Sequence, residues 1–261
     1  MSTRTLLHRH RGFTLVEAII TIVLTGILAG IVAVFVTIPV KAYFDVERRS
    51  ALGDAADTAL RRIARDLRTA LPNSLRLTGI TQIEFIPIRS AGRYRAELDN
   101  GGGGNPLDFN AAADTFDVVG PGVNIAAGDY IVIYNLGISG ADAYNGDSRR
   151  LATSAGNTLT SVGFSGGMFP FQSPAKRFQV VGTPVSFVCS GTAMTRYWNY
   201  AYGAAPTTGS SAPIADNVTD CAFVYQAGVT AMNGLVTLHL TLTREGESVN
   251  LIHQVHLSNA P

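Results

Sequence analysis

Residues 13–38 read FTLVEAIITIVLTGILAGIVAVFVTI, and Glu17 is the only charged residue among them. As a helix that rises about 1.5 Å per residue, this run is long enough to cross a hydrocarbon core of about 30 Å. We therefore predict a transmembrane helix over residues 13–38. A carboxylate in a membrane span is costly unless it finds a partner, so Glu17 is a candidate functional residue.

The residues before the apolar run predict its orientation. Arg4, Arg9 and Arg11 precede the run, and residues 1–12 contain no acidic residue. The positive-inside rule therefore predicts a cytoplasmic N-terminus, with the rest of the chain outside. A cleaved secretory signal is the alternative. It fits poorly, because the run is too long for a signal core and residues 37–40 (TIPV) contain no small-x-small cleavage site.

A second helical pattern follows the apolar run. Across residues 43–71, apolar residues recur every three or four positions and charged residues fill the others, which is typical of an amphipathic helix. Pro72 predicts the end of this helix at Leu71, because the residue before a proline disfavours helical backbone. We therefore expect one long helix over residues 13–72, with a transmembrane part and an amphipathic part. The expected buried positions of the second part are Leu52, Ala56, Ala59, Leu60, Ile63, Leu67 and Ala70.

The remainder, residues 73–261, reads as strands separated by loops. Runs rich in β-branched and aromatic residues alternate with glycine and proline clusters, a pattern typical of antiparallel sheets. The last two runs alternate apolar and polar residues around a turn at residues 244–247, which predicts a hairpin with one buried face. The predicted fold is therefore α+β, a long N-terminal helix packed on a mainly antiparallel β-sheet head. The expected strands span residues 82–88, 115–119, 130–135, 178–181, 185–189, 221–226, 235–243 and 249–257.

The composition excludes several classes of protein. Hydrophobic residues make up 46% and charged residues 15% of the 261 residues, so the chain is not disordered and can form a core. The formal net charge is +1 and the basic residues are scattered, which argues against nucleic acid as a partner. Two cysteines are too few for a disulfide scaffold.

The N-terminal pattern resembles a known family. A basic leader ending at Gly12, followed by FTLVE at residues 13–17 and an apolar run, is similar to the class III signal of type IV prepilins and pseudopilins. The resemblance implies that a prepilin peptidase cleaves between Gly12 and Phe13 on the cytoplasmic side and methylates the new amine of Phe13. Residues 1–12 are then the leader peptide, and the membrane span stays in the mature protein. A plain signal anchor is the alternative.

The same resemblance implies a role for Glu17 in assembly. In a filament, Glu17 of an incoming subunit would pair with the amine of Phe13 in a subunit already assembled. This pair would set the axial register and help to extract the helix from the membrane. It would also remove the cost of an isolated carboxylate near lipid. A role limited to recognition by the peptidase is the alternative for Glu17.

Parts of the head resemble one class within this family. Residues 61–74 (RRIARDLRTALPNS), 195–200 (TRYWNY) and 235–261 look like the O-type minor pilin of the mannose-sensitive haemagglutinin (MSHA) pilus, a class related to the J-type minor pseudopilins of type II secretion. The resemblance implies a pilin fold and a minor pilin that initiates or caps filament assembly. The alternatives are a J-like minor pseudopilin of a type II secretion system and a filament-tip module for ligand binding or adhesion.

The resemblance also implies partners and a location. The expected partners are other major and minor pilins, the prepilin peptidase, an inner-membrane assembly platform and membrane lipid, with no nucleic acid. We expect a single-pass protein of the inner membrane with its head in the periplasm, and in an extracellular pilus after assembly. No enzymatic activity, catalytic residue or cofactor is expected.

Two groups of residues are candidate metal ligands. His253 and His256 lie on opposite faces of the last expected strand, whereas His239 and His253 could meet across the hairpin. No cysteine or carboxylate lies beside these histidines, so we interpret them as sheet residues. Residues 141–148 (ADAYNGDS), with Asp142, Asn145 and Asp147, have a loose calcium-loop spacing but no suitably placed glutamate, and a turn explains them as well. No metal site is expected.

Two further expectations concern the head. A ligand-binding head would use aromatic side chains that we expect to be exposed, namely Tyr197, Trp198, Tyr200 and Tyr202.

Cys189 and Cys221 are the only cysteines. The head is expected outside the cytoplasm, where disulfides persist, so we predict that these two cysteines are joined. Two buried thiols are the alternative.

Overall fold

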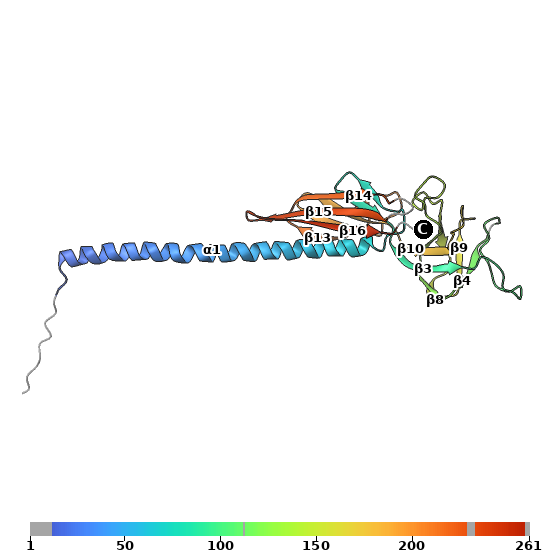
Figure 1. Cartoon of the computed structure of the whole chain (residues 1–261), viewed down its shortest axis with the longest axis horizontal. Helices are drawn as coiled ribbons and strands as arrows, with labels where there is room; N and C mark the ends of the chain where they lie inside the picture. Colours follow the sequence, from blue (N-terminus) through green and yellow to red (C-terminus); the bar gives the residue numbers. More distant parts are fainter. Residues whose placement is uncertain (1–11, 112, 229–232, 259–261) are drawn as a thin grey trace, which may run out of the picture. The chain divides into compact units, whose positions relative to one another are not determined.

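The structure, a computed structural model, describes residues 12–111, 113–228 and 233–258. It contains a long helix, α1 (Leu15–Leu67), followed by strands β1 to β16 and a short 3-10 helix at Pro206–Thr208 (Figure 1). The strands pair in antiparallel fashion. The α+β class predicted from the sequence is therefore confirmed. The chain divides into two compact units, Met1–Ser50 and Ala51–Pro261.

The first unit contains the apolar part of α1. Its large hydrophobic side chains are exposed, with values between 48% at Phe44 and 76% at Leu15. A helix that is apolar on all sides is typical of a segment that lies in lipid or among other helices. Among the described residues, α1 is the one helix long and apolar enough to cross a membrane, which is consistent with membrane anchoring. The helix continues through Pro39 without interruption.

The second unit begins with the amphipathic end of α1. Its buried positions pack in one core with Phe85, Phe187 and Leu238 from the sheets. Arg196 Nε donates to Asp66 Oδ2 at 2.8 Å and ties a strand to this end of the helix. The predicted apolar positions are buried, except Ala70, which is partly buried. The buried residues of α1 are Leu52, Ala56, Ala59, Leu60, Ile63, Ala64 and Leu67.

The helix ends at Leu67, earlier than the Leu71 predicted from Pro72. The cause is pairing with a distant segment. The amide of Leu71 donates to the carbonyl of Ile86 at 2.7 Å, and the amide of Ile88 donates to the carbonyl of Thr69 at 2.8 Å. These bonds form a bridge that replaces the last helical turn, so tertiary contacts decide this boundary.

Two antiparallel sheets build the part of the head that contains the helix end. One sheet has the order β1-β2-β11-β12-β13, and the other has the order β14-β15-β16. Apolar side chains from both sheets share the core that contains the end of α1. The strands are β1 (Arg76–Thr78), β2 (Gln82–Phe85), β11 (Val185–Ser190), β12 (Ala193–Trp198), β13 (Ser210–Asp216), β14 (Val218–Gln226), β15 (Gly234–Arg244) and β16 (Glu247–Leu257).

The predicted hairpin is formed by β15 and β16. Its two-residue loop, Glu245 and Gly246, has positive φ values of 51° and 90°, which is the requirement of a type I′ turn. The register pairs Leu238 with His253 and His239 with Ile252. The two histidines therefore lie on opposite faces, and the expectation that they could meet across the hairpin is wrong.

A separate β-barrel is inserted into this head between β2 and β11. Its six strands close in the order β10-β3-β4-β9-β7-β6, around a core that includes Phe116, Phe164 and Phe178. The first inserted strand, β3, pairs with the last, β10, so the insertion starts and ends at adjacent strands. The strands are β3 (Ile88–Tyr94), β4 (Thr115–Val119), β6 (Tyr130–Val132), β7 (Arg149–Ala152), β9 (Ser161–Ser165) and β10 (Arg177–Val181), with a two-stranded ribbon of β5 (Val123–Ile125) and β8 (Gly156–Leu159).

Candidate functional site

Thr14 caps the N-terminus of α1. Its hydroxyl oxygen accepts a hydrogen bond from the amide of Glu17 at 3.2 Å, and its carbonyl accepts the first helical bond, from the amide of Ala18, at 3.1 Å. Thr-x-x-Glu is the pattern of a capping box, in which the cap satisfies one of the free amides of the first turn. The helix therefore begins at Leu15, two residues after the predicted start at Phe13.

Glu17 occupies the first turn of this helix. A negative charge there is favourable, because the helix dipole places partial positive charge at the N-terminus. The residue is exposed, and no cation of residues 12–111, 113–228 and 233–258 forms an ion pair with it. The charge of Glu17 is therefore available to a partner from outside the described part of the chain.

The bond between Gly12 and Phe13 is accessible and lies before the helix. Both residues are exposed and non-helical, with Phe13 at 74%. A Cβ added at Gly12 would meet no atom within 4 Å, and the backbone of Gly12 does not have the positive φ that favours glycine. The fold of this chain therefore does not require glycine at residue 12. Residues 1–11 of the expected leader lie outside the described residues.

Residues 7–33 match the family model of the prokaryotic N-terminal methylation motif. This N-terminal motif supports a type IV pilin-like protein. The match includes Gly12, Phe13, Glu17 and the first part of the apolar run. A motif of this type implies interaction with a prepilin peptidase and with pilus components in general. Comparisons with curated proteins and with solved structures gave no match.

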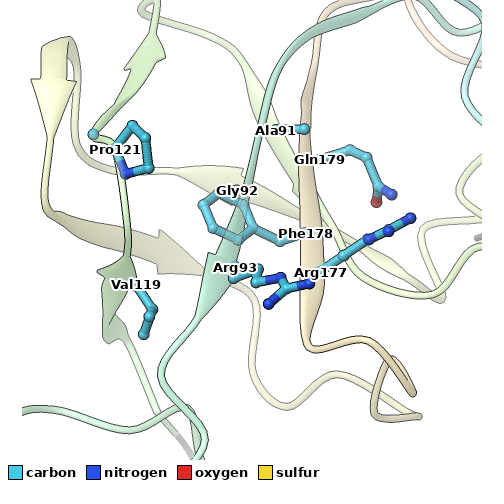
Figure 2. A pocket seen from close by; sticks show the side chains of 9 residues that line it. Ala91, Gly92, Arg93, Val119, Pro121, Arg177, Phe178 and Gln179 are labelled. Carbon is cyan, nitrogen blue, oxygen red and sulfur yellow. The ribbon is translucent and has the colours of Figure 1, made fainter.

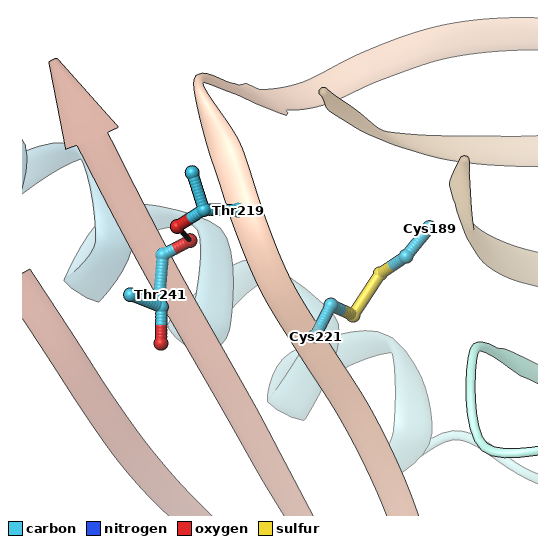
Figure 3. Close-up of a disulfide and its surroundings, with 4 residues drawn as sticks. All are labelled: Cys189, Thr219, Cys221 and Thr241. Atoms are coloured by element: carbon cyan, nitrogen blue, oxygen red, sulfur yellow. Dashed lines mark hydrogen bonds between the residues drawn. A yellow bond between two sulfur atoms is a disulfide. The ribbon is translucent and has the colours of Figure 1, made fainter. Parts of the chain in front are cut away.

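A disulfide joins the two sheets that pack with the end of α1. Cys189 on β11 is bonded to Cys221 on β14, with a Cα–Cα distance of 6.4 Å (Figure 3). Backbone hydrogen bonds to residues 80 and 81 lie beside the disulfide. The amide of Phe223 donates to the carbonyl of Ile80 at 2.7 Å, and the amide of Cys189 donates to the carbonyl of Thr81 at 2.9 Å. The crosslink therefore lies where the two sheets already meet.

The expected patch of exposed aromatic residues is not present. Tyr200 is only 3% exposed. Its hydroxyl donates to Glu84 Oε2 at 2.8 Å and lies 2.5 Å from Ser186 Oγ. Burial raises the pKa of Tyr200, so the hydroxyl stays protonated and acts as a donor. Tyr197, Trp198 and Tyr202 are half-buried. The prediction fails because these side chains pack within the head: Tyr202 contacts the rings of Tyr130 and Tyr144, and Trp198 packs partly against the core.

Removing the hydroxyl of Tyr200 tests its buried hydrogen bonds. We expect Tyr200→Phe to lower the free energy of unfolding by about 1–3 kcal/mol, because Glu84 and Ser186 lose a buried partner. Tyr197→Phe is the matched control, expected to stay within about 0.5 kcal/mol. Urea unfolding of the full chain in detergent, followed by near-UV circular dichroism, measures both. Equal stability of the two variants would contradict the role of the Tyr200 hydroxyl.

The carboxylates of residues 141–148 already have partners within the protein. Asp142 forms an ion pair with Arg76, which also lies over the ring of Tyr144, 3.8 Å from its centroid. Asp147 Oδ2 accepts from the amides of Gly140 at 3.0 Å and Asp142 at 3.3 Å. Within the described residues, no group of three or more His, Cys, Asp or Glu could hold a metal ion.

Sequence reasoning missed the cap and the barrel. The pattern Thr14-x-x-Glu17 was a usable signal for the cap, since a capping box is visible in sequence. The closure of β3 to β10 has no such local signal, because it depends on pairing between distant strands.

Proposed function

We propose that this chain is a minor pilin that initiates or caps assembly of a type IV pilus of the MSHA class, after processing by a prepilin peptidase. The N-terminal segment supports the proposal most strongly. It combines the methylation motif at residues 7–33, an exposed Gly12–Phe13 bond before a capped helix, and Glu17 in the first turn of an apolar helix of membrane-spanning length.

The inserted barrel favours a minor subunit over a major one. Residues 88–181 contribute strands to a second body with its own core. In a helical array of identical subunits, every copy of this barrel would need room beside its neighbours. A subunit present at low copy number, at the start of the filament, does not need this space in every repeat of the array.

The proposed assembly step uses the charges at the start of α1. Cleavage creates a positive amine at Phe13, near the carboxylate of Glu17 in the sequence. In the proposed filament, Glu17 of one subunit pairs with this amine on another, so that neither charge is isolated near lipid. The proposed location is the inner membrane with a periplasmic head, then the pilus. The partners are other pilins and the assembly platform, and the chain catalyses no reaction.

Processing is tested by changing the residue before the cleaved bond. We expect Gly12→Glu to leave the leader attached, because the fold does not need glycine at this position and the requirement comes from the peptidase. Ser2→Glu adds the same charge to the leader and is the control, expected to be cleaved. Mass spectrometry of the N-terminus shows whether the leader is retained or removed in each variant. For the unchanged chain we expect methylated Phe13 as the first residue. A mature N-terminus elsewhere would remove the basis of the proposal.

The same N-terminal motif serves pili and secretion pseudopili, so a second experiment separates these functions. We expect deletion of the chain to reduce surface pili, measured by electron microscopy and by the major pilin in the sheared fraction. Restoration by the unchanged chain is the control. Normal piliation together with lost export of a secreted protein would instead indicate the J-like pseudopilin of a type II secretion system.

A further inference from the structure

A hollow of about 380 Å³ lies against strands β3 and β10 of the inserted barrel (Figure 2). Phe178 points into the barrel core, so strand alternation places its neighbours Arg177 and Gln179 on the other face of β10. Figure 2 shows these two side chains extending to the same side. The residues that line the hollow include Arg93, Val119, Pro121, Arg177, Phe178 and Gln179.

Two arginines without acidic partners lie side by side at this hollow. Arg93 on β3 is directly opposite Arg177 on β10, and both are exposed. All 19 Asp and Glu side chains belong to the described residues, and none forms an ion pair with either arginine. Like charges directly opposite each other destabilise an antiparallel pair. An anion between them would relieve this repulsion.

The other cations close to the hollow have acidic partners. Arg95 forms ion pairs with Asp99 and with Asp117. Lys176 lies 3.8 Å from Glu97. The positive charge that remains unbalanced here is therefore that of Arg93 and Arg177.

Gln179 supplies a second, independent sign of a ligand. Its side chain is 7% exposed, and its Oε1 is buried without a hydrogen-bond partner among the described residues. A buried acceptor without a donor costs about 1–3 kcal/mol, and native structures contain few of them. Because Gln179 lines the hollow, a rotation of its side chain would let this oxygen accept from an O–H or N–H donor beside the anionic group of a ligand.

We propose that this hollow binds an acidic saccharide unit. The ligand carboxylate lies between Arg93 and Arg177, and the Gln179 side chain rotates so that its Oε1 accepts from a neighbouring hydroxyl. The volume suits one small ligand. Val119 lies on β4, opposite Arg93 on β3. Its exposed side chain offers apolar contact to the ring carbons of the saccharide. This binding goes beyond the proposed function, since neither processing nor assembly uses these residues.

The strand pairing disfavours an acidic peptide as the ligand. Peptides often bind by adding a strand to a free sheet edge. At Arg93, β3 is paired on one side with β10 and on the other with β4. At Gln179, β10 is paired with β3 and with β6. At Arg93 and Gln179 both edges of the strand are therefore occupied, so a compact ligand fits better there than an extended chain.

Calorimetric titration of the full chain in detergent tests the proposal. We expect D-galacturonate to bind at least tenfold more tightly than neutral D-galactose. Arg93→Ala with Arg177→Ala should weaken galacturonate binding at least tenfold, as the loss of hydrogen bonds to a charged group implies. The control is Arg62→Ala with Arg68→Ala, which removes the same charge from one exposed position on α1 and one just after its end and should leave binding unchanged. Thermal melting verifies that all variants are folded.

A change at Gln179 separates recognition of a saccharide from simple anion binding. We expect Gln179→Leu to weaken galacturonate binding severalfold and to leave acetate binding unchanged, because acetate has no hydroxyl donor. Equal binding of galactose, insensitivity to the arginine changes, insensitivity to Gln179→Leu, or no binding at millimolar galacturonate would each overturn the proposal. Tighter binding of tetraglutamate through the same arginines would identify a peptide ligand and would also overturn it.

Discussion

Glu17→Gln is expected to reduce incorporation of this chain into filaments at least about tenfold, which corresponds to a loss of about 1.4 kcal/mol. Glutamine also suits the last position of a capping box, and the bond from the amide of residue 17 to Thr14 Oγ1 involves only main chain at that residue. The substitution therefore removes the charge and retains the start of the helix. It tests the proposed pair between Glu17 and the amine of Phe13 separately from the cap.

The matched variants complete this experiment. Glu17→Asp keeps the charge and should retain part of the incorporation, whereas Thr14→Val removes the cap and keeps Glu17. Immunoblots compare the chain in sheared filaments with the chain in membranes, and mass spectrometry verifies cleavage. If Glu17→Gln is cleaved and incorporated at the unchanged level, the assembly role is wrong. If it is not cleaved, Glu17 acts in peptidase recognition.

Removal of the disulfide is expected to have the largest effect on the stability of the head. Cys189 and Cys221 are separated by 32 residues, and closing a loop of this length stabilises a fold by about 3–4 kcal/mol in the chain-entropy model. We expect Cys189→Ala with Cys221→Ala to lower the free energy of unfolding by about this amount. At about 2–4 °C per kcal/mol, the melting temperature should fall by roughly 6–16 °C.

The measurement is thermal unfolding of the full chain in detergent, followed by near-UV circular dichroism. Reductant should lower the melting temperature of the unchanged chain and leave that of the double variant unaffected. Thr219→Ala changes an exposed residue of the same strand and is the control, expected to have a small effect. Two titratable thiols in native protein without reductant would contradict the crosslink.

Strand prediction succeeded where side chains alternate or are strongly apolar. Residues 115–119 were predicted as a strand and form β4 with the same bounds. The hairpin of β15 and β16 was also predicted, since its alternation extends along both strands. In contrast, β8 (GNTL) and β13 (SSAPIAD, with Pro213) have little β propensity. Their extended form depends on partners elsewhere in the chain, and no local pattern in the sequence indicates these pairings.

Local interactions explain what the sequence determined by itself. The processing motif, the apolar helix and the buried face of its amphipathic part depend on neighbouring residues, so they were visible without the structure. Only the tertiary structure placed the end of α1 at Leu67, buried Tyr200, and closed the barrel so that Arg93 faces Arg177. These features depend on pairing between distant segments, where many partners compete for the same backbone hydrogen bonds and only the packed chain selects among them.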